Sequence, residues 1–365
     1  MIEAPLKERL RARIAATGPI TVADYMASCL GDPRDGYYTT REPFGTGGDF
    51  ITAPEVSQMF GELIGAFMLQ AYEHAGRPKD FLLVELGPGR GTLMADLLRT
   101  ARLQPDFVAN ARLCMVETSA RLRAKQGETL KDGPLVPEFF DKVADLPDWP
   151  LFLVANEFLD ALPIHQFVKT GTEWRERMVG LDADGELAFG VGTTTLPGDQ
   201  LPPENARIPA GAILETQPAS NAVAEEIGAR LKARGGCALF IDYGYLKTAA
   251  GDTLQALYKQ KPDPVLAHPG NADLTAHVNF EALAKAAGHG GATALPPLTQ
   301  GEFLVRLGLL ERAGRLGSGK SHSEQEQIRD AVERLAAPDQ MGDLFKVLAL
   351  TGDEAPLIPF DSPPL

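Results

Sequence analysis

At residues 83–92 the chain reads LVELGPGRGT, which places an apolar run directly before three glycines separated by one residue each. The apolar, β-rich run predicts a buried strand, and the pattern from Thr92 onward predicts a helix immediately after the glycines. Glycine lets the backbone turn sharply and lets a ligand approach without meeting a Cβ. The N-terminus of the following helix offers backbone N–H groups that have no partner within the helix. The segment therefore predicts a cofactor-binding turn between a strand and a helix.

The glycine spacing separates two classes of cofactor. A dinucleotide-binding turn should read GxGxxG, whereas this turn reads GxGxG, with Pro88 after the first glycine and Glu85 shortly before it. The pattern E-x-G-x-G-x-G instead resembles the first motif of class I S-adenosylmethionine methyltransferases. Their cofactor has no phosphate and carries an amino group and a sulfonium cation, so a nearby carboxylate is favourable. We expect Glu85, Gly87, Gly89 and Gly91 to lie at the cofactor.

The pattern of apolar and polar residues around this turn predicts an α/β fold. Nearly continuous apolar strands alternate with helices, which is typical of a mostly parallel, Rossmann-like sheet covered by helices on both faces. Strands are expected at 81–87, 111–117, 150–155 and 237–242, and helices at 92–102, 119–130, 221–233 and 278–287. We divide the chain into an N-terminal helical and loop region (1–80), the first part of the core (81–162), an inserted segment of short strands with a Pro-rich loop (163–211), and the remainder of the core (212–365).

Acidic residues follow the predicted strands where a parallel sheet binds its ligands. Glu117, after the second strand, can accept both ribose hydroxyls of a nucleoside, which serves S-adenosylmethionine and NAD equally. Asn156, Glu157 and Asp160 follow a later strand and are expected near the cofactor and the reacting methyl group. Carboxylates there suit a cationic acceptor such as guanidinium, a planar fork of donors. A solvated strand end at Glu117 and a solvated helix start at Glu157 and Asp160 remain as alternatives.

Two later segments add candidate contacts. Asp242 and Tyr243 end a further strand and are expected to face the same crevice, Asp242 as a catalytic residue and Tyr243 at the substrate. His268 and Asp273 lie in a loop and are expected to contact substrate or to structure that loop. A metal site is not expected, because the separation of His268 and His277 matches no standard ligand spacing.

Composition excludes several classes of function. The 365 residues carry a formal net charge of −14, which disfavours sequence-independent nucleic-acid binding. No apolar run reaches the roughly 18 residues of a membrane helix. The cysteines are odd in number and far apart, and Cys114 and Cys237 read as buried thiols of a cytoplasmic protein. Glu3 and Glu8 among the N-terminal arginines argue against an import peptide.

Five segments together resemble the MidA-type methyltransferases, over roughly residues 5–350: GDFITAPEVSQMFGELIG, VELGPGRGTLMADLLR, NEFLDALPIHQF, IDYGY and DPVLAHPGNADLTAHVNF. The resemblance implies a class I methyltransferase fold and S-adenosyl-L-methionine as cofactor, with the three glycines at the cofactor and Glu117 on its ribose. Mitochondrial members of the family are arginine methyltransferases that assist assembly of respiratory complex I and modify its 49-kDa-type subunit. This chain resembles a bacterial member of the family, and the expected substrate is an arginine-bearing protein. The sequence leaves open whether the chain forms a homodimer.

The expected reaction is in-line methyl transfer to a protein arginine nitrogen, with Glu157, helped by Asp160 or Asp242, orienting the guanidinium. Two other functions stay open. A non-catalytic assembly factor could keep the cofactor pocket and use the helical region to bind a partner. An NAD-dependent oxidoreductase is disfavoured by the glycine spacing. The glycine-rich stretch Thr46–Thr52 could move over the cofactor.

Overall fold

The structure is a computed structural model that describes residues 4–40, 52–202, 205–353 and 357–360. The chain divides into two compact units. Unit 1 comprises Met1–Phe50, Asp160–Ser220 and Lys247–Asn279, and unit 2 comprises Ile51–Leu159, Asn221–Leu246 and Phe280–Leu365. These boundaries differ from the predicted ones, because residues 51–80 belong to the same unit as the parallel sheet and residues 247–279 do not. The stretch Thr46–Thr52 lies, apart from Thr52, outside the described residues.

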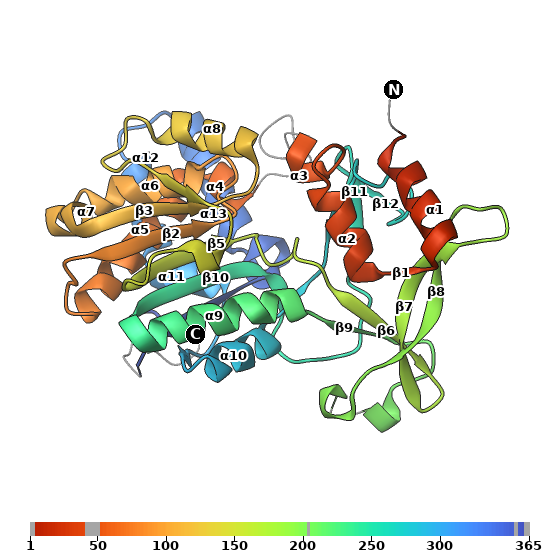
Figure 1. Cartoon of the computed structure of the whole chain (residues 1–365). Coiled ribbons are helices and arrows are strands. Elements are labelled where there is room, and N and C mark those ends of the chain that lie inside the picture. Colours follow the sequence, from red (N-terminus) through yellow and green to blue (C-terminus); the bar gives the residue numbers. More distant parts are fainter. Residues whose placement is uncertain (1–3, 41–51, 203–204, 354–356, 361–365) are drawn as a thin grey trace. The chain divides into compact units, whose positions relative to one another are not determined.

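Unit 2 is built on a largely parallel sheet whose strands follow the order β4-β3-β2-β5-β10-β17-β15. Figure 1 labels β3, β2, β5 and β10 of this sheet. Strands β4, β3, β2, β5 and β10 are mutually parallel, and β17 runs antiparallel to β10. The strands are β2 (Phe81–Leu86), β3 (Ala111–Val116), β4 (Glu138–Phe140), β5 (Leu151–Asn156), β10 (Gly236–Tyr245), β15 (Thr293–Ala294), β16 (Leu298–Thr299) and β17 (Phe345–Thr351).

Helices cover both faces of this sheet, because its strands are apolar on both sides. Phe81 and Leu83 pack into a core shared with α5 and α6, and the alternate residues Leu82 and Val84 are equally buried. Figure 1 shows α9 and α10 on the face opposite α5 and α11. The predicted parallel sheet with helices on both faces is confirmed. The helices are α4 (Ala53–Val56), α5 (Gln58–His74), α6 (Thr92–Ala101), α7 (Pro105–Asn110), α8 (Ala120–Leu130), α9 (Pro218–Arg234), α10 (Phe280–His289), α11 (Gln300–Arg306), α12 (Leu309–Gly317) and α13 (His322–Ala336).

Close packing of α5 on α6 depends on small residues in α5. A Cβ added at Gly61 would lie 2.6 Å from the Cβ of Asp96, and one at Gly65 would lie 2.9 Å from the carbonyl oxygen of Leu97. The side chain of Ser57 begins α5 by accepting from the N–H of Met59. The helix that carries these glycines is therefore held directly over the helix that follows the cofactor-binding turn.

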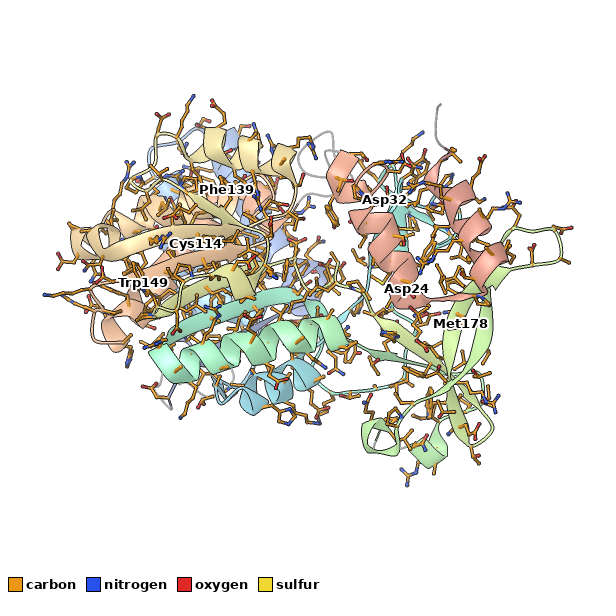
Figure 2. All side chains as sticks on the ribbon, in the orientation of Figure 1. Asp24, Asp32, Cys114, Phe139, Trp149 and Met178 are labelled. Carbon is orange, nitrogen blue, oxygen red and sulfur yellow. The ribbon has the colours of Figure 1, made fainter. Side chains whose placement is uncertain are left out.

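Unit 1 contains antiparallel sheets and short helices. One sheet has the order β1-β7-β6-β9 with β8 paired to β7, and a second has the order β12-β11-β13. Arg9 of α1 donates to Asp32 at 2.8 and 2.9 Å and to Asp35 at 2.8 Å, and Figure 2 labels Asp32 at the end of α2. The elements are α1 (Leu6–Thr17), β1 (Ile20–Thr21), α2 (Val22–Gly31), α3 (Tyr37–Thr40), β6 (His165–Thr170), β7 (Glu173–Leu181), β8 (Leu187–Thr195), β9 (Ile213–Thr216), β11 (Gln255–Tyr258), β12 (Lys261–Asp263), β13 (Asp273–Thr275) and β14 (Val278–Asn279).

The three cysteines are buried free thiols, which confirms the prediction for Cys114 and Cys237. Figure 2 shows Cys114 within the sheet of unit 2, on β3, and burial raises the pKa of its thiol to about 12. Within the described ranges, no helix is both long and apolar enough to cross a membrane.

Candidate functional site

The carboxyl ends of four neighbouring strands of unit 2 form one edge of the sheet. The chain leaves β2 toward β3 on one side, and β5 and β10 lie on the other side, so the strand order reverses between β2 and β5. Ligands of open α/β sheets bind outside the strand ends at such a reversal. Gly87 donates its N–H to the carbonyl of Val116 at 3.0 Å, and Glu157 donates its N–H to Ile241 at 2.9 Å. The register thus places the predicted residues after β3, β2, β5 and β10 along a single edge.

The three glycines of the turn adopt backbone conformations that favour glycine. Their φ angles are +58° at Gly87, +52° at Gly89 and +80° at Gly91. A Cβ at Gly87 would lie 2.8 Å from the Phe158 ring, and one at Gly91 would lie 3.5 Å from Cα of Gln126. The turn therefore needs glycine for its backbone shape and, at Gly87, for space.

Glu85 lies beneath this turn, and its side chain is buried in the sheet. The residue is 3% exposed, and Oε2 has no hydrogen-bond partner within the described part of the chain. Burial holds the pKa of Glu85 well above its usual range. A cation close by would act in the opposite direction and favour the carboxylate.

Glu117 is held by two donors at the end of β3. Its Oε1 accepts from the N–H of Ser119 at 2.7 Å, and its Oε2 accepts from Nε2 of Gln126 at 3.4 Å. Burial raises the pKa of Glu117, and these donors partly counteract that effect. Gln126 also donates to the carbonyl oxygen of Gly89 at 2.9 Å. The residue predicted for the ribose is thus linked to the glycine turn.

Glu157 has an unusual backbone for its residue type. Its φ is +50°, in the left-handed region that costs a non-glycine residue about 1–3 kcal/mol. Its Oε1 accepts from Nδ2 of Asn156 at 3.1 Å and from the N–H of Ala53 at 3.3 Å. The side chain is partly exposed. Because strain of this kind collects at functional sites, the conformation marks Glu157 as a functional candidate.

Asp242 and Tyr243 point into the protein. Asp242 is 1% exposed, and its two oxygens accept from the N–H groups of Leu159 and Tyr243, each at 3.0 Å. The ring of Tyr243 packs against Phe345, with ring centroids 5.5 Å apart. Asp242 thus fixes the turn after Glu157, and Tyr243 contributes to the core.

The other predicted residues belong to unit 1. Asp160 and Asp273 are both buried, and the Tyr38 hydroxyl donates to Oδ1 of Asp273 at 3.1 Å. Burial raises the pKa of Tyr38 well above its usual range, and the charges of Asp273 and Asp160 add to that effect. These two candidates therefore lie near one tyrosine.

His268 lines a cavity of about 580 Å³ in unit 1. Its Nδ1 lies 2.7 Å from Oδ2 of Asp263, and its ring stacks on Tyr258 with centroids 4.2 Å apart. The side chain is therefore oriented by an acid and an aromatic ring. Over the described ranges, no group of three or more His, Cys, Asp and Glu side chains could hold a metal ion.

Two residues of the edge were missed by the sequence reasoning. Glu55 of α4 accepts from the Thr92 hydroxyl at 2.9 Å and lies 3.6 Å from the Arg90 guanidinium. Gln126 lies on the face of α8 that also carries Leu122, and both are buried. That helical spacing was a signal for an inward side chain, whereas nothing local to Glu55 pointed to the glycine turn.

Comparison with known proteins gives a consistent result. Residues 63–298 match a family model described as a putative S-adenosyl-L-methionine-dependent methyltransferase. The mitochondrial protein arginine methyltransferase NDUFAF7 of Rattus norvegicus is 34% identical over 377 residues, covering 95% of this chain and 84% of the relative. The Homo sapiens protein of that name is 35% identical over 373 residues, covering 95% and 83%. A crystal structure of a Burkholderia thailandensis protein bound to S-adenosyl-homocysteine, described as a "likely methyl transferase", has 30% identity and a TM-score of 0.84, covering 96% of this chain and 93% of that one.

The edge of unit 2 fits the cofactor of these proteins. The glycine turn leaves space for close approach, and Glu117 supplies carboxylate oxygens that can accept from ribose hydroxyls. The buried Oε2 of Glu85, which lacks a partner in the described residues, suits a cationic amino-acid group better than a phosphate. When bound, this cofactor supplies a methyl group that a sulfonium centre has already activated.

Proposed function

Because the chain belongs to the family of S-adenosyl-L-methionine-dependent methyltransferases, we propose that its methyl acceptor is an arginine side chain of a protein. The relatives named protein arginine methyltransferases match 95% of this chain, which supports the same substrate class. The observation that carries the proposal is the Glu157 carboxylate at the strand reversal, on a backbone with φ of +50°. A carboxylate beside the cofactor-binding turn can bind a cationic acceptor through charge-assisted hydrogen bonds, and its strained backbone supports a functional role.

Glu157 would orient the guanidinium. A carboxylate can accept from the N–H donors of this planar fork and concentrate electron density on one nitrogen. The donors from Asn156 and Ala53 restrict rotation of the Glu157 carboxylate, so its plane is set before the substrate arrives. Positioning of reactants in this way can supply on the order of 7–11 kcal/mol of the barrier reduction.

The remaining candidates take supporting roles in the proposal. Asp242 acts as a positioning residue, because both of its oxygens hold the backbone around the turn that carries Glu157. Asp160 stays a candidate catalytic residue, and Asp273 and His268 stay candidate substrate contacts, as proposed from the sequence. Tyr243 packs in the core and would act through Asp242, whose Oδ1 accepts its N–H.

We further propose a bacterial, cytoplasmic protein whose first substrate to test is the bacterial homologue of the 49-kDa-type complex I subunit. The family resemblance of the five sequence segments supports this choice. The substrate protein would be incubated with the enzyme and S-adenosylmethionine, and arginine methylation would be located by mass spectrometry. Methylation of a different side chain type, with arginine unmodified, would show that the acceptor proposal is wrong.

Glu157→Gln tests the role of the carboxylate while preserving its shape. We expect methylation to fall at least about a hundredfold, by analogy with the loss of one preorganised hydrogen-bonding group from an oxyanion hole, which costs about 2.7–4 kcal/mol. S-adenosylhomocysteine should bind both proteins equally. The matched control is Glu128→Gln on the exposed end of α8, which should methylate at the rate of the unmodified protein. Full activity of Glu157→Gln would contradict the role given to this residue.

A further inference from the structure

We infer that Gln126 is a positioning residue for the cofactor, which ties the glycine turn to Glu117. Gln126 is fully buried on α8 and touches both parts of the site assigned to the nucleoside. The inference rests on the cofactor assignment and on Glu117 binding the ribose. It does not depend on which methyl acceptor the enzyme uses.

The orientation of the Gln126 amide follows from its neighbours. The carbonyl oxygen of Gly89, 2.9 Å from Nε2 of Gln126, accepts hydrogen bonds and never donates them. The same holds for the carboxylate oxygen of ionised Glu117, at 3.4 Å. The NH₂ group of Gln126 must therefore face both of them. The amide thus bridges the middle glycine of the turn and the acid at the end of the adjacent strand.

Packing reinforces this bridge. Cα of Gln126 lies 3.5 Å from the place where a Cβ on Gly91 would stand, so α8 is in contact with the last glycine of the turn. The long hydrogen bond to Glu117 and the short one to Gly89 share one nitrogen. If the turn moved away from β3, Gln126 would lose its hydrogen bond either to Gly89 or to Glu117. Gln126 therefore sets the spacing between Gly89 and Glu117.

A second buried glutamine shows what is specific to Gln126. Gln300 is also fully buried, its Nε2 donates to the Leu335 carbonyl at 2.8 Å, and its Oε1 lacks a partner in the described residues, as does that of Gln126. A buried amide with an unpaired oxygen is therefore not the distinguishing feature. What distinguishes Gln126 is that its two acceptors both belong to the cofactor site.

The test is a double-mutant cycle read out by calorimetric titration with S-adenosylhomocysteine. We expect Gln126→Met and Glu117→Gln each to raise Kd about tenfold, which corresponds to ~1.4 kcal/mol. Since Gln126 and Glu117 belong to one bridge, their effects should overlap, and the double variant should lose less than the hundredfold expected of two independent contacts. Gln300→Met is the matched control, and its Kd should equal that of the unmodified protein, even if its unfolding temperature falls.

The outcomes separate the possible failures. An unchanged Kd for Gln126→Met, or a hundredfold loss in the double variant, would overturn the inference. An unchanged Kd for Glu117→Gln would overturn the ribose assignment itself and leave the arginine proposal standing. If Gln126→Met fails to fold, Gln126→Glu serves instead, because it keeps the shape and replaces the donor by a carboxylate. Its Kd should exceed that of the unmodified protein most at pH 8 and less at pH 6, where the new acid takes up a proton and can donate. A pH-independent ratio of the two Kd values would contradict the bridge.

Discussion

The left-handed backbone at Glu157 makes a prediction that separates stability from activity. Glu157→Gly and Glu157→Ala both remove the carboxylate and the two hydrogen bonds that its Oε1 accepts. They differ in the φ of +50°, which glycine adopts freely and alanine does not. Both variants lose the same side-chain contacts, so these losses cancel in the comparison. The difference in unfolding free energy between the two variants therefore reports the backbone strain.

The magnitude follows from two opposing terms. Placing alanine in the left-handed region costs about 1–2 kcal/mol, and the greater freedom of glycine in the unfolded chain costs about 0.5–1 kcal/mol. Glycine should therefore give the more stable variant, by roughly 0.5–1 kcal/mol. In a unit of about 150–250 residues, this corresponds to a difference of about 1–4 °C in unfolding temperature.

Urea unfolding of both variants, followed by circular dichroism, measures the difference. Methyl transfer should be lost in both variants, because neither carries a carboxylate at this position. A control pair at Gly180, where φ is not positive, should show the opposite order, with Gly180→Ala at least as stable as the unmodified protein. If Glu157→Ala were as stable as Glu157→Gly, the left-handed conformation at this residue would be refuted.

Three further predictions concern packing, pH and the cofactor. Gly61→Ala should lower the unfolding free energy by about 1–2 kcal/mol, because the crowding of the new Cβ outweighs the gain in helix propensity. Gly127→Ala in α8, where a Cβ would have no atom within 4 Å, should raise it by about 0.5–1 kcal/mol. Denaturant titration of both variants measures these changes. Burial raises the pKa of Asp96 to about 6, so the folded protein holds this proton more tightly than the unfolded chain, and the unfolding free energy should fall as pH rises from about 4 to 6. Asp96→Asn should make that slope shallower by the share of one carboxyl, the rest belonging to other buried acids such as Glu85 and Glu117. An unchanged slope would show that Asp96 does not hold a proton in this range. Gly89→Val, at a φ of +52°, should abolish S-adenosylhomocysteine binding in calorimetry, and retained partner capture without turnover would favour an assembly role.

Local patterns were sufficient to predict the sheet and its cofactor turn. The strands β2, β3 and β5 and the glycines of the turn follow from apolar runs and residue spacing within short windows. The left-handed conformation of Glu157 left no sequence signal, because a glutamate is rarely chosen for that backbone. The inward direction of Asp242 depends on the N–H groups of Leu159 and Tyr243. Leu159 is distant in sequence, so only the folded chain reveals this arrangement.

The division into units was harder to predict, because it depends on contacts between separate segments. Residues 163–211 read as an insertion, but their strands pair with β1 and pack with α1 and α2 in a core that also includes residues 254–276. Leu6, Leu10 and Ile14 look like one face of a surface helix until the partner segments are known. The segments that form this core are far apart in the sequence, so local patterns do not reveal that they pack together.

The interleaved course of the chain has a consequence for its synthesis. The chain passes from one unit to the other after Phe50, Leu159, Ser220, Leu246 and Asn279. No single continuous fragment therefore contains all of either unit, and limited proteolysis at one bond cannot release either of them whole. On the ribosome, unit 1 lacks β13 until Thr275 has emerged, and the sheet of unit 2 lacks β17 until Thr351 has emerged. Early segments of both units must wait for late ones, so a nascent chain arrested before residue 345 would expose the unpaired edge of β10 to chaperones and proteases.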